Sequence, residues 1–439
     1  MLTFGFEKEE ESQCWIEGLI AILNAYPTGH VKLREFCSMA LENALAPESH
    51  GPMTPRDILD EHMHRHVDGY YDNRLNTNGL DPTHTPAKAH REERVRARVL
   101  SAGGVEAVAR VMRADHASSY VLTVSGCCIL TKIASSCRHD RWSPWANATC
   151  TTGIADSAGK VAVAAVGGAD IAVSVLANWV TKAAPPPFRD TIAAVHAALA
   201  LLATLSSCSG IFQHDSVLRA GGARACAEVM QLLPHEPNIL YMCISVLTKL
   251  AGGNATCQQS VREVDAAGLA VAAMKRHRHR ADTVEYCCRL FTALTQIPLV
   301  TRSVADTIFA SDIVDAGGLS QTISAMRHHH NEASLVVFGL RALGNLAACS
   351  EAHNRRVIDS GAIPLLASML LQEAPREVNR RRSSAAVVEG ALMALYNIVM
   401  RDPTGKAKEA ALALGVKSEW LDGYKAEIDN GTLPSVIAP

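Results

Sequence analysis

A small-residue turn, followed at a near-constant distance by an apolar helical signature, is the feature that most constrains how this chain can fold. The turns are Gly103-Gly104, Gly167-Gly168, Gly221-Gly222, Ala267-Gly268, Gly317-Gly318 and Gly361-Ala362. The signature, L-x-x-[LI], follows them after 27, 35, 26, 27, 26 and 34 residues. Four of these steps agree within one residue, and the two long ones contain insertions at 182–190 and 372–384. A fixed period of this kind indicates an array of structural repeats.

The pattern inside one repeat is helical. Ile363, Leu366 and Leu370 follow a turn at i, i+3 and i+7, the spacing of one helix face. Glycine accepts the positive φ that a helix C-terminus often needs, so the turn chemistry fits. A single repeat cannot bury its apolar face, whereas stacked neighbours can. The sequence therefore predicts an all-α solenoid.

Composition limits the classes of partner and compartment. The net charge of −2 and the pI of about 6.8 do not suit a nucleic-acid binder held by bulk positive charge. The acidic start "MLTFGFEKEEESQ" is unlike a signal peptide, and no apolar run approaches the ~20 residues of a membrane span. We expect a soluble cytoplasmic protein with neither a membrane nor a nucleic-acid partner.

The 13 cysteines show no disulfide or CxxC spacing, which indicates buried thiols in a reducing compartment. Those in apolar helical patterns are Cys37, Cys127, Cys128, Cys208, Cys226, Cys243, Cys287, Cys288 and Cys349.

Residues 340–370 resemble an armadillo repeat, whose pattern is A-L-x-N-L, then Asn in a short helix, then G-x-I-P-x-L. The matching residues are Ala342, Leu343, Asn345, Leu346, Asn354, Ile358, Gly361, Ile363, Pro364 and Leu366. The resemblance extends over residues 93–400. It implies a right-handed α-solenoid of about six armadillo-like repeats with helical caps at both ends.

On this basis we divide the chain into four segments. Residues 1–46 are expected to form an N-terminal helical cap or degenerate repeat, and 47–90 an inserted segment rich in His and Pro, with one helix at 54–71. Residues 91–403 form the repeat array, and 404–439 form C-terminal capping helices and a tail.

The resemblance also implies a concave groove, lined by the long helix of each repeat, that binds extended peptides or partner proteins. In nuclear-import adaptors a ladder of Asn residues grips the peptide, with a Trp four residues earlier. The ladder positions here hold Lys132, Thr204, Lys249, Gln296, Asn345 and Asn397, and no Trp precedes them. We therefore exclude the import adaptors and predict a groove that binds through Lys132, Lys249, Gln296, Arg341, Asn345 and Asn397. The alternative is that these side chains are solvated or paired within the protein.

Two insertions offer further contacts. Trp142 and Trp145 beside basic residues are typical interface anchors, and the alternative is that the two rings tuck the loop back onto the array. The sequence "RRRSS" predicts a solvated basic loop in which Ser383 and Ser384 are candidates for phosphorylation.

Few residues suggest catalysis or metal binding. His62 and His66 have the i, i+4 spacing of some zinc sites, but the HExxH order is missing and a polar helix face explains them better. Histidines at 277–279 and 328–330 occupy the same inter-helix joint of successive repeats. No G-x-S-x-G, P-loop or kinase signature occurs. We expect no enzyme activity, cofactor, metal or small-molecule substrate.

The leading hypothesis is a non-catalytic scaffold that binds a partner protein through its groove, its insertions or both. Base rates for such repeat proteins suggest a cytoskeletal or ciliary (axonemal) assembly. The alternative is a soluble signalling or transport adaptor that binds an extended or acidic peptide. A third hypothesis is an enzyme or metal protein using residues 60–66.

Overall fold

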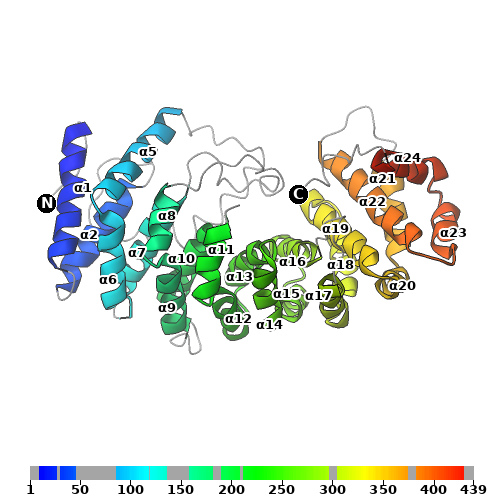
Figure 1. Ribbon diagram of the computed structural model, residues 1–439, viewed down its shortest axis with the longest axis horizontal. Coiled ribbons are helices and arrows are strands. Elements are labelled where there is room, and N and C mark those ends of the chain that lie inside the picture. Colours follow the sequence, from blue (N-terminus) through cyan, green and yellow to red (C-terminus); the bar gives the residue numbers. More distant parts are fainter. Residues whose placement is uncertain are drawn as a thin grey trace. The chain divides into compact units, whose positions relative to one another are not determined.

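The computed structural model describes residues 9–26, 30–45, 86–117, 119–135, 158–180, 189–207, 211–295, 304–373 and 382–429. Within these ranges the chain forms 22 helices and no strand (Figure 1). It divides between Ala225 and Cys226 into two compact units. The predicted all-α architecture is confirmed.

The N-terminal unit is built around three stacked long helices, because α2 packs against α7 and α7 against α10. Its helices are α1 (Glu9–Ala25), α2 (Val31–Ala44), α5 (Pro86–Ser101), α6 (Gly104–Asp115), α7 (Tyr120–Ala134), α8 (Ala158–Ala165), α9 (Gly168–Val180), α10 (Arg189–Leu205) and α11 (Ile211–Arg219).

The C-terminal unit stacks α13 on α16, α16 on α19 and α19 on α22. Helix α12 (Gly222–Leu232) contains the division between the units. The others are α13 (Pro237–Ala251), α14 (Ala255–Glu263), α15 (Ala266–Arg276), α16 (Ala281–Leu294), α17 (Val304–Asp315), α18 (Gly318–His328), α19 (Ala333–Cys349), α20 (Glu351–Asp359), α21 (Ala362–Glu373), α22 (Arg382–Met400), α23 (Lys406–Ala413) and α24 (Ser418–Asp429).

Each complete repeat contains a short helix, a middle apolar helix and a long helix, as in α17, α18 and α19. The glycine turn connects the first two. Its first residue has a positive φ, 73° at Gly103 and 91° at Gly317. Its second residue lies tightly against the preceding helix: a Cβ on Gly318 would come within 2.8 Å of the Ile313 carbonyl oxygen. These repeats stack in each unit into the armadillo-like α-solenoid that the sequence predicts.

One turn differs from its expected position. The residue with positive φ before α15 is Asp265, at 52°, and the helix begins at Ala266, so the turn precedes the predicted Ala267-Gly268. The Asp265 side chain accepts a hydrogen bond from the Gly268 amide and caps the helix. An Asp can occupy this conformation because its short side chain bonds locally.

Two further boundaries differ from prediction. Helix α22 begins at Arg382, so Ser383 and Ser384 lie in its first turn instead of a loop. Helix α5 begins at Pro86, inside the segment expected to be an insertion. Among the described residues no single helix is long and apolar enough to cross a membrane; the bent pair α8 and α9, at 59°, passes by length and composition alone.

Candidate partner-binding face

The candidate face is formed by the outward side chains of the long helices. In the N-terminal unit the residues at the ladder positions, Lys132 and Thr204, make internal contacts. The Lys132 ammonium lies 3.4 Å from a carboxylate oxygen of Glu42 on α2, and the Glu42 side chain is only 5% exposed. The Thr204 hydroxyl donates to the Ala200 carbonyl of its own helix, at 2.9 Å. Both side chains therefore contribute to packing here.

The register of the long helix α16 corrects one predicted position. Phe291 and Leu294 lie 11 and 14 residues after its N-cap Arg280, as Leu343 and Leu346 do after Glu332. The apolar signature in this repeat is therefore Phe291-x-x-Leu294 instead of Leu294-x-x-Ile297. Measured from Asp265, it follows the turn after 26 residues, the step of the regular repeats.

This register changes which side chains face the groove. Helix α16 ends at Leu294, so Gln296 lies beyond it and outside the described residues. The ladder position is Ala293, and the position four residues earlier is Arg289. Arg289 is therefore the equivalent of Arg341 on α19.

The two arginines belong to a row of stacked side chains that crosses α13, α16 and α19. We call it the aromatic–arginine stripe: Tyr241, Tyr286, Arg289, Phe338 and Arg341. The Tyr241 and Tyr286 ring centroids are 4.4 Å apart. The Arg289 guanidinium lies 4.8 Å from the Tyr286 centroid and 4.3 Å from that of Phe338, and the Arg341 guanidinium lies 5.7 Å from Phe338. At these distances cation–π attraction joins neighbouring repeats.

Charge pairing fixes the centre of the stripe. The Arg289 guanidinium lies 2.6 Å from a Glu285 carboxylate oxygen, which also accepts a hydrogen bond from the Ser334 hydroxyl of α19 at 2.9 Å. Arg289 is only 6% exposed, so its positive charge acts on neighbouring side chains of the stripe and is largely shielded from solvent.

Arg341 is half-buried, so part of its side chain is exposed to solvent. Burial lowers its pKa, the Arg289 charge acts in the same direction, and Glu389 opposes them. A guanidinium keeps its proton at any physiological pH, so Arg341 is a partly desolvated cation at one end of the stripe.

The two asparagines at ladder positions, Asn345 and Asn397, differ in their hydrogen bonds. The Asn397 side-chain amide donates to the Gly344 carbonyl of α19 at 3.2 Å, which ties α22 to its neighbour. Asn345, one turn after Arg341, is half-buried, and its amide makes no hydrogen bond to any described residue. Lys249 is half-buried on α13. Asn345 is therefore a predicted groove residue with an available side-chain amide, and it lies beside the half-buried Arg341.

The stripe itself was not predicted. Its signal is present in the sequence, since Tyr286 and Phe338 each stand six residues after an N-cap, and Arg289 and Arg341 each stand nine after it. The signal is visible only once α16 is placed in its correct register.

Several predicted sites lie outside the described residues: Trp142, Trp145 and the 60–66 cluster. Within the described ranges, no group of three or more His, Cys, Asp and Glu side chains could hold a metal ion. The described cysteines of the predicted set are buried and form no disulfide, and Cys208 lies outside the described residues. Burial raises the pKa of Cys127 and of Cys288 to about 12, which makes these thiols poor nucleophiles at neutral pH.

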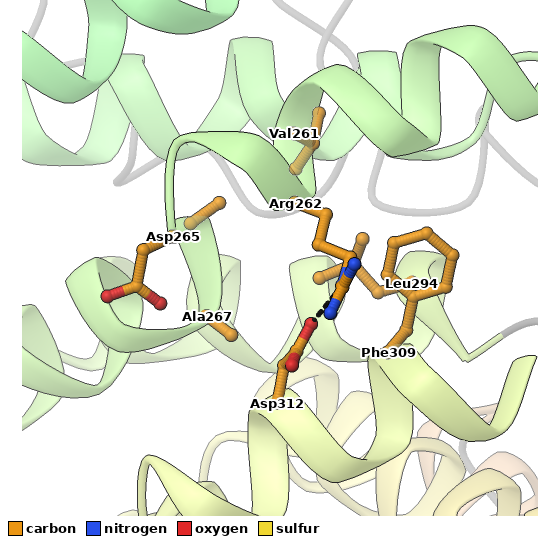
Figure 2. Close-up of a pocket in the computed structure, with 8 residues that line it drawn as sticks. Val261, Arg262, Asp265, Ala267, Leu294, Phe309 and Asp312 are labelled. Carbon is orange, nitrogen blue, oxygen red and sulfur yellow. Dashed lines mark hydrogen bonds and ion pairs between the residues drawn. The ribbon is translucent and has the colours of Figure 1, made fainter. Parts of the chain in front are cut away.

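A small hollow in the C-terminal unit shows how closely the short helices pack. It lies between α14, α15, α16 and α17 and holds about 10 Å³ of free space, room for about one water molecule. Figure 2 shows Arg262 reaching across it to Asp312, at 2.6 Å. This hollow is too small for a substrate or cofactor.

No family model and no curated protein matches the chain. Several solved structures are similar to the chain. One engineered protein is 14% identical, with a TM-score of 0.58 over 95% of this chain and 92% of its own. A second engineered protein is 16% identical, with a TM-score of 0.50 over 68% of this chain and 97% of its own. At these identities the likeness is one of fold alone.

A designed armadillo repeat protein in complex with the peptide (KR)4 is also similar. It is 15% identical, with a TM-score of 0.45 over 61% of this chain and 96% of its own. A match of this strength supports no comparison of binding residues.

Proposed function

We propose that this protein is a non-catalytic scaffold that binds an extended segment of a partner protein across the long helices of its C-terminal unit. The observation that carries the proposal is the aromatic–arginine stripe, with Asn345 beside it. Half-buried aromatic rings and a partly desolvated arginine are the side chains that most often dominate binding energy at protein interfaces.

The stripe suits an extended chain because it runs across three successive long helices. Arg341 offers guanidinium donors, and Asn345 offers both a donor and an acceptor to a peptide backbone. The N-terminal unit offers less, because Lys132 already contacts Glu42. The alternative function, an adaptor that binds an acidic peptide, therefore has less support at Lys132 than at Arg341.

The test is affinity purification with mass spectrometry on the full chain and on the variant Arg341→Ala/Asn345→Ala. Loss of a truncated hot-spot side chain costs about 2 kcal/mol, so the double variant should reduce capture of a groove partner by at least about tenfold. The matched control is Arg355→Ala, an exposed arginine on α20 whose side chain is 68% exposed. Equal capture by all three proteins would exclude the long-helix face as the site.

We further propose a cytoplasmic setting within a cytoskeletal or ciliary assembly. This rests on the frequency with which such repeat scaffolds occur there. Proximity labelling in ciliated cells tests it, since enrichment of axonemal or cytoskeletal neighbours is expected. A labelled set without such neighbours would refute this setting and leave the scaffold function intact.

A further inference from the structure

The C-terminal unit carries a second surface, at the joints that precede its long helices. Three joints, 233–236, 277–280 and 329–332, connect α12 to α13, α15 to α16 and α18 to α19. We define the histidine edge as the basic side chains of these joints other than the ion-paired Arg280, together with the last residues of α15 and α18. It consists of His235, Arg276, His277, Arg278, His279, His328, His329 and His330. The edge is separate from the aromatic–arginine stripe, so the inference does not depend on the proposed function.

Two contacts recur at equivalent positions in each step from one joint to the next. The last residue of the middle helix contacts a ring in the preceding joint: Arg276 Nη1 lies 3.0 Å from His235 Nε2, and His328 Nε2 lies 3.2 Å from His279 Nδ1. The first joint residue contacts a carbonyl oxygen in the preceding joint: His277 Nε2 lies 2.9 Å from that of Pro234, and His329 Nε2 lies 2.7 Å from that of Arg278. The three joints therefore form one continuous ridge.

The hydrogen bonds fix the tautomers at the centre of the ridge. Arg278 Nε donates to His279 Nε2 at 2.9 Å, so His279 must carry its proton on Nδ1 and donate it to His328 Nε2. Both rings are neutral in this arrangement. Partial desolvation lowers the pKa of His328, and its basic neighbours His329, His279 and Arg278 lower it further. The centre of the ridge thus holds two neutral imidazoles joined by a hydrogen bond.

Charge is unbalanced along the ridge. At its centre Arg276 and Arg278 are exposed and form no ion pair with any described residue. Lys275 adds a further exposed charge at the end of α15, and Arg327 does the same at the end of α18.

Acidic groups face the ridge at three places. Asp282 pairs with Arg280 at 2.8 Å and cancels its charge. Glu236 and Glu332 stand at the N-caps of α13 and α19, one at each end of the ridge. The excess positive charge is therefore confined to a short central stretch.

We propose that the histidine edge binds a short acidic segment of a partner protein. Guanidinium and imidazolium groups match carboxylates in geometry and charge, and the central joint offers both. Neighbouring helices are about 8–10 Å apart, so two steps span about 20 Å, the length of about six residues of extended chain. A long polyanion such as a nucleic acid is disfavoured, because it would run past Glu236 and Glu332 and would find no Trp, Tyr or Phe side chain for base stacking among the residues defined as this edge.

Protonation links this binding to pH. A carboxylate that replaces the hydrogen bond between His279 and His328 favours the imidazolium form of His328, because an opposite charge now lies nearby. Binding therefore takes up protons, and affinity rises as the pH falls through the titration range of histidine, about 7.5 to 6.

The experiment is fluorescence anisotropy of the full chain with a labelled peptide of about eight residues, alternating Glu and Gly, at low salt. We expect affinity to rise about tenfold between about pH 7.5 and pH 6. The variant Arg276→Gln/Arg278→Gln should lose at least about tenfold in affinity at either pH. The variant His279→Gln/His328→Gln should bind at pH 7.5 and lose the pH response.

Matched controls are Lys408→Gln and Arg355→Gln, exposed charges on α23 and α20, and a peptide with Gln in place of Glu. Circular dichroism confirms that each variant is folded. Binding that is equal in Arg276→Gln/Arg278→Gln and in the controls would overturn the edge as the site. A single-stranded oligonucleotide that displaces the peptide at lower concentration than unlabelled peptide would overturn the choice of partner. An unchanged pH response in His279→Gln/His328→Gln would overturn the role of the rings.

Discussion

The long helices of the two units are held by different polar contacts. In the N-terminal unit α2 is attached through charges: Arg34 pairs with Asp115 on α6, and Glu42 contacts Lys132 on α7. In the C-terminal unit a side-chain amide or hydroxyl bonds a backbone carbonyl of the neighbouring long helix. Thr292 donates to Phe338 at 3.2 Å, and Asn397 donates to Gly344 at 3.2 Å.

The difference explains why the two faces offer different surfaces to a partner. In the N-terminal unit Lys132, at a ladder position, forms an ion pair with Glu42 and so attaches the first long helix, α2. In the C-terminal unit the ion pairs between helices join short helices, such as Arg262 to Asp312, and the arginines of the long helices α16 and α19 take part in the aromatic–arginine stripe. One architecture thus carries one face on which a lysine is paired to the neighbouring long helix and another on which aromatic rings and arginines stack in a row.

The largest effect should come from breaking the buried charge pair of the N-terminal unit. Arg34 is fully buried, so Arg34→Met leaves Asp115 without its cation in a largely desolvated position. We expect a loss of about 3 kcal/mol of unfolding free energy, measured by urea denaturation, with faster hydrogen exchange in residues 31–44. The matched control is Lys32→Met, because Lys32 is 94% exposed and pairs only at the surface with Glu35. A loss in Arg34→Met no larger than in Lys32→Met would contradict the view that charges attach α2.

The counterpart in the C-terminal unit is Asn354, which is 1% exposed. Its side-chain amide donates at 2.9 Å to the Ile398 carbonyl, one of the last four carbonyls of α22, which have no partner within their own helix. Asn354→Ala should cost about 2 kcal/mol, because a buried acceptor loses its donor.

The salt dependence of the stability loss distinguishes the Asn354 contact from the charge pair of the N-terminal unit. The control for Asn354→Ala is Ser368→Ala, since Ser368 bonds only within its own helix. The effect of Asn354→Ala should be the same at low and high salt, whereas salt screens the charges around Arg34 that are partly exposed. A salt-dependent loss in Asn354→Ala would remove the contrast between the two units.

Much of the fold could be predicted because its determinants are local. The stretch 340–370 was expected to contain a long helix, a short helix and a turn, and α19, α20 and the start of α21 occupy it. Buried cysteines and glycine turns follow from residue type alone.

The register of α16 could not be predicted in the same way. Phe291, Leu294 and Ile297 are spaced by three, so two placements of the apolar signature fit the sequence equally. Only the N-cap at Arg280 distinguishes them. The pairing of Glu42 with Lys132, 90 residues apart, depends on how helices stack, and no local pattern shows it.

The glycine turns are a feature that the two units share, so substitutions there should act equally in both. Gly103→Ala and Gly317→Ala force a side chain into a positive φ, at a cost of about 1–2 kcal/mol each in unfolding free energy. The control is Gly18→Ala in the exposed face of α1, where a Cβ meets nothing within 4 Å and should stabilise the helix by up to about 1 kcal/mol. Unequal losses at Gly103 and Gly317 would show that the units differ in scaffold as well as in face.

The smallest expected effect concerns pH and the short helices of the C-terminal unit. His353 is buried between α20 and α17, with Ser350 Oγ 2.7 Å from Nδ1 and Ser311 Oγ 3.1 Å from Nε2. Burial lowers its pKa, Arg356 acts in the same direction, and Asp315 opposes them. The unfolded chain therefore binds a proton at His353 more readily than the folded chain does. The stabilisation that comes from neutral His353 is complete above about pH 6.5 and is lost as the pH falls through the pKa of the folded state. His353→Gln should flatten the fall in unfolding free energy between about pH 6.5 and 5, whereas Ser311→Ala, which keeps the ring, should retain it. An equal slope in His353→Gln and the unaltered protein would place the acid sensitivity of this unit in other histidines.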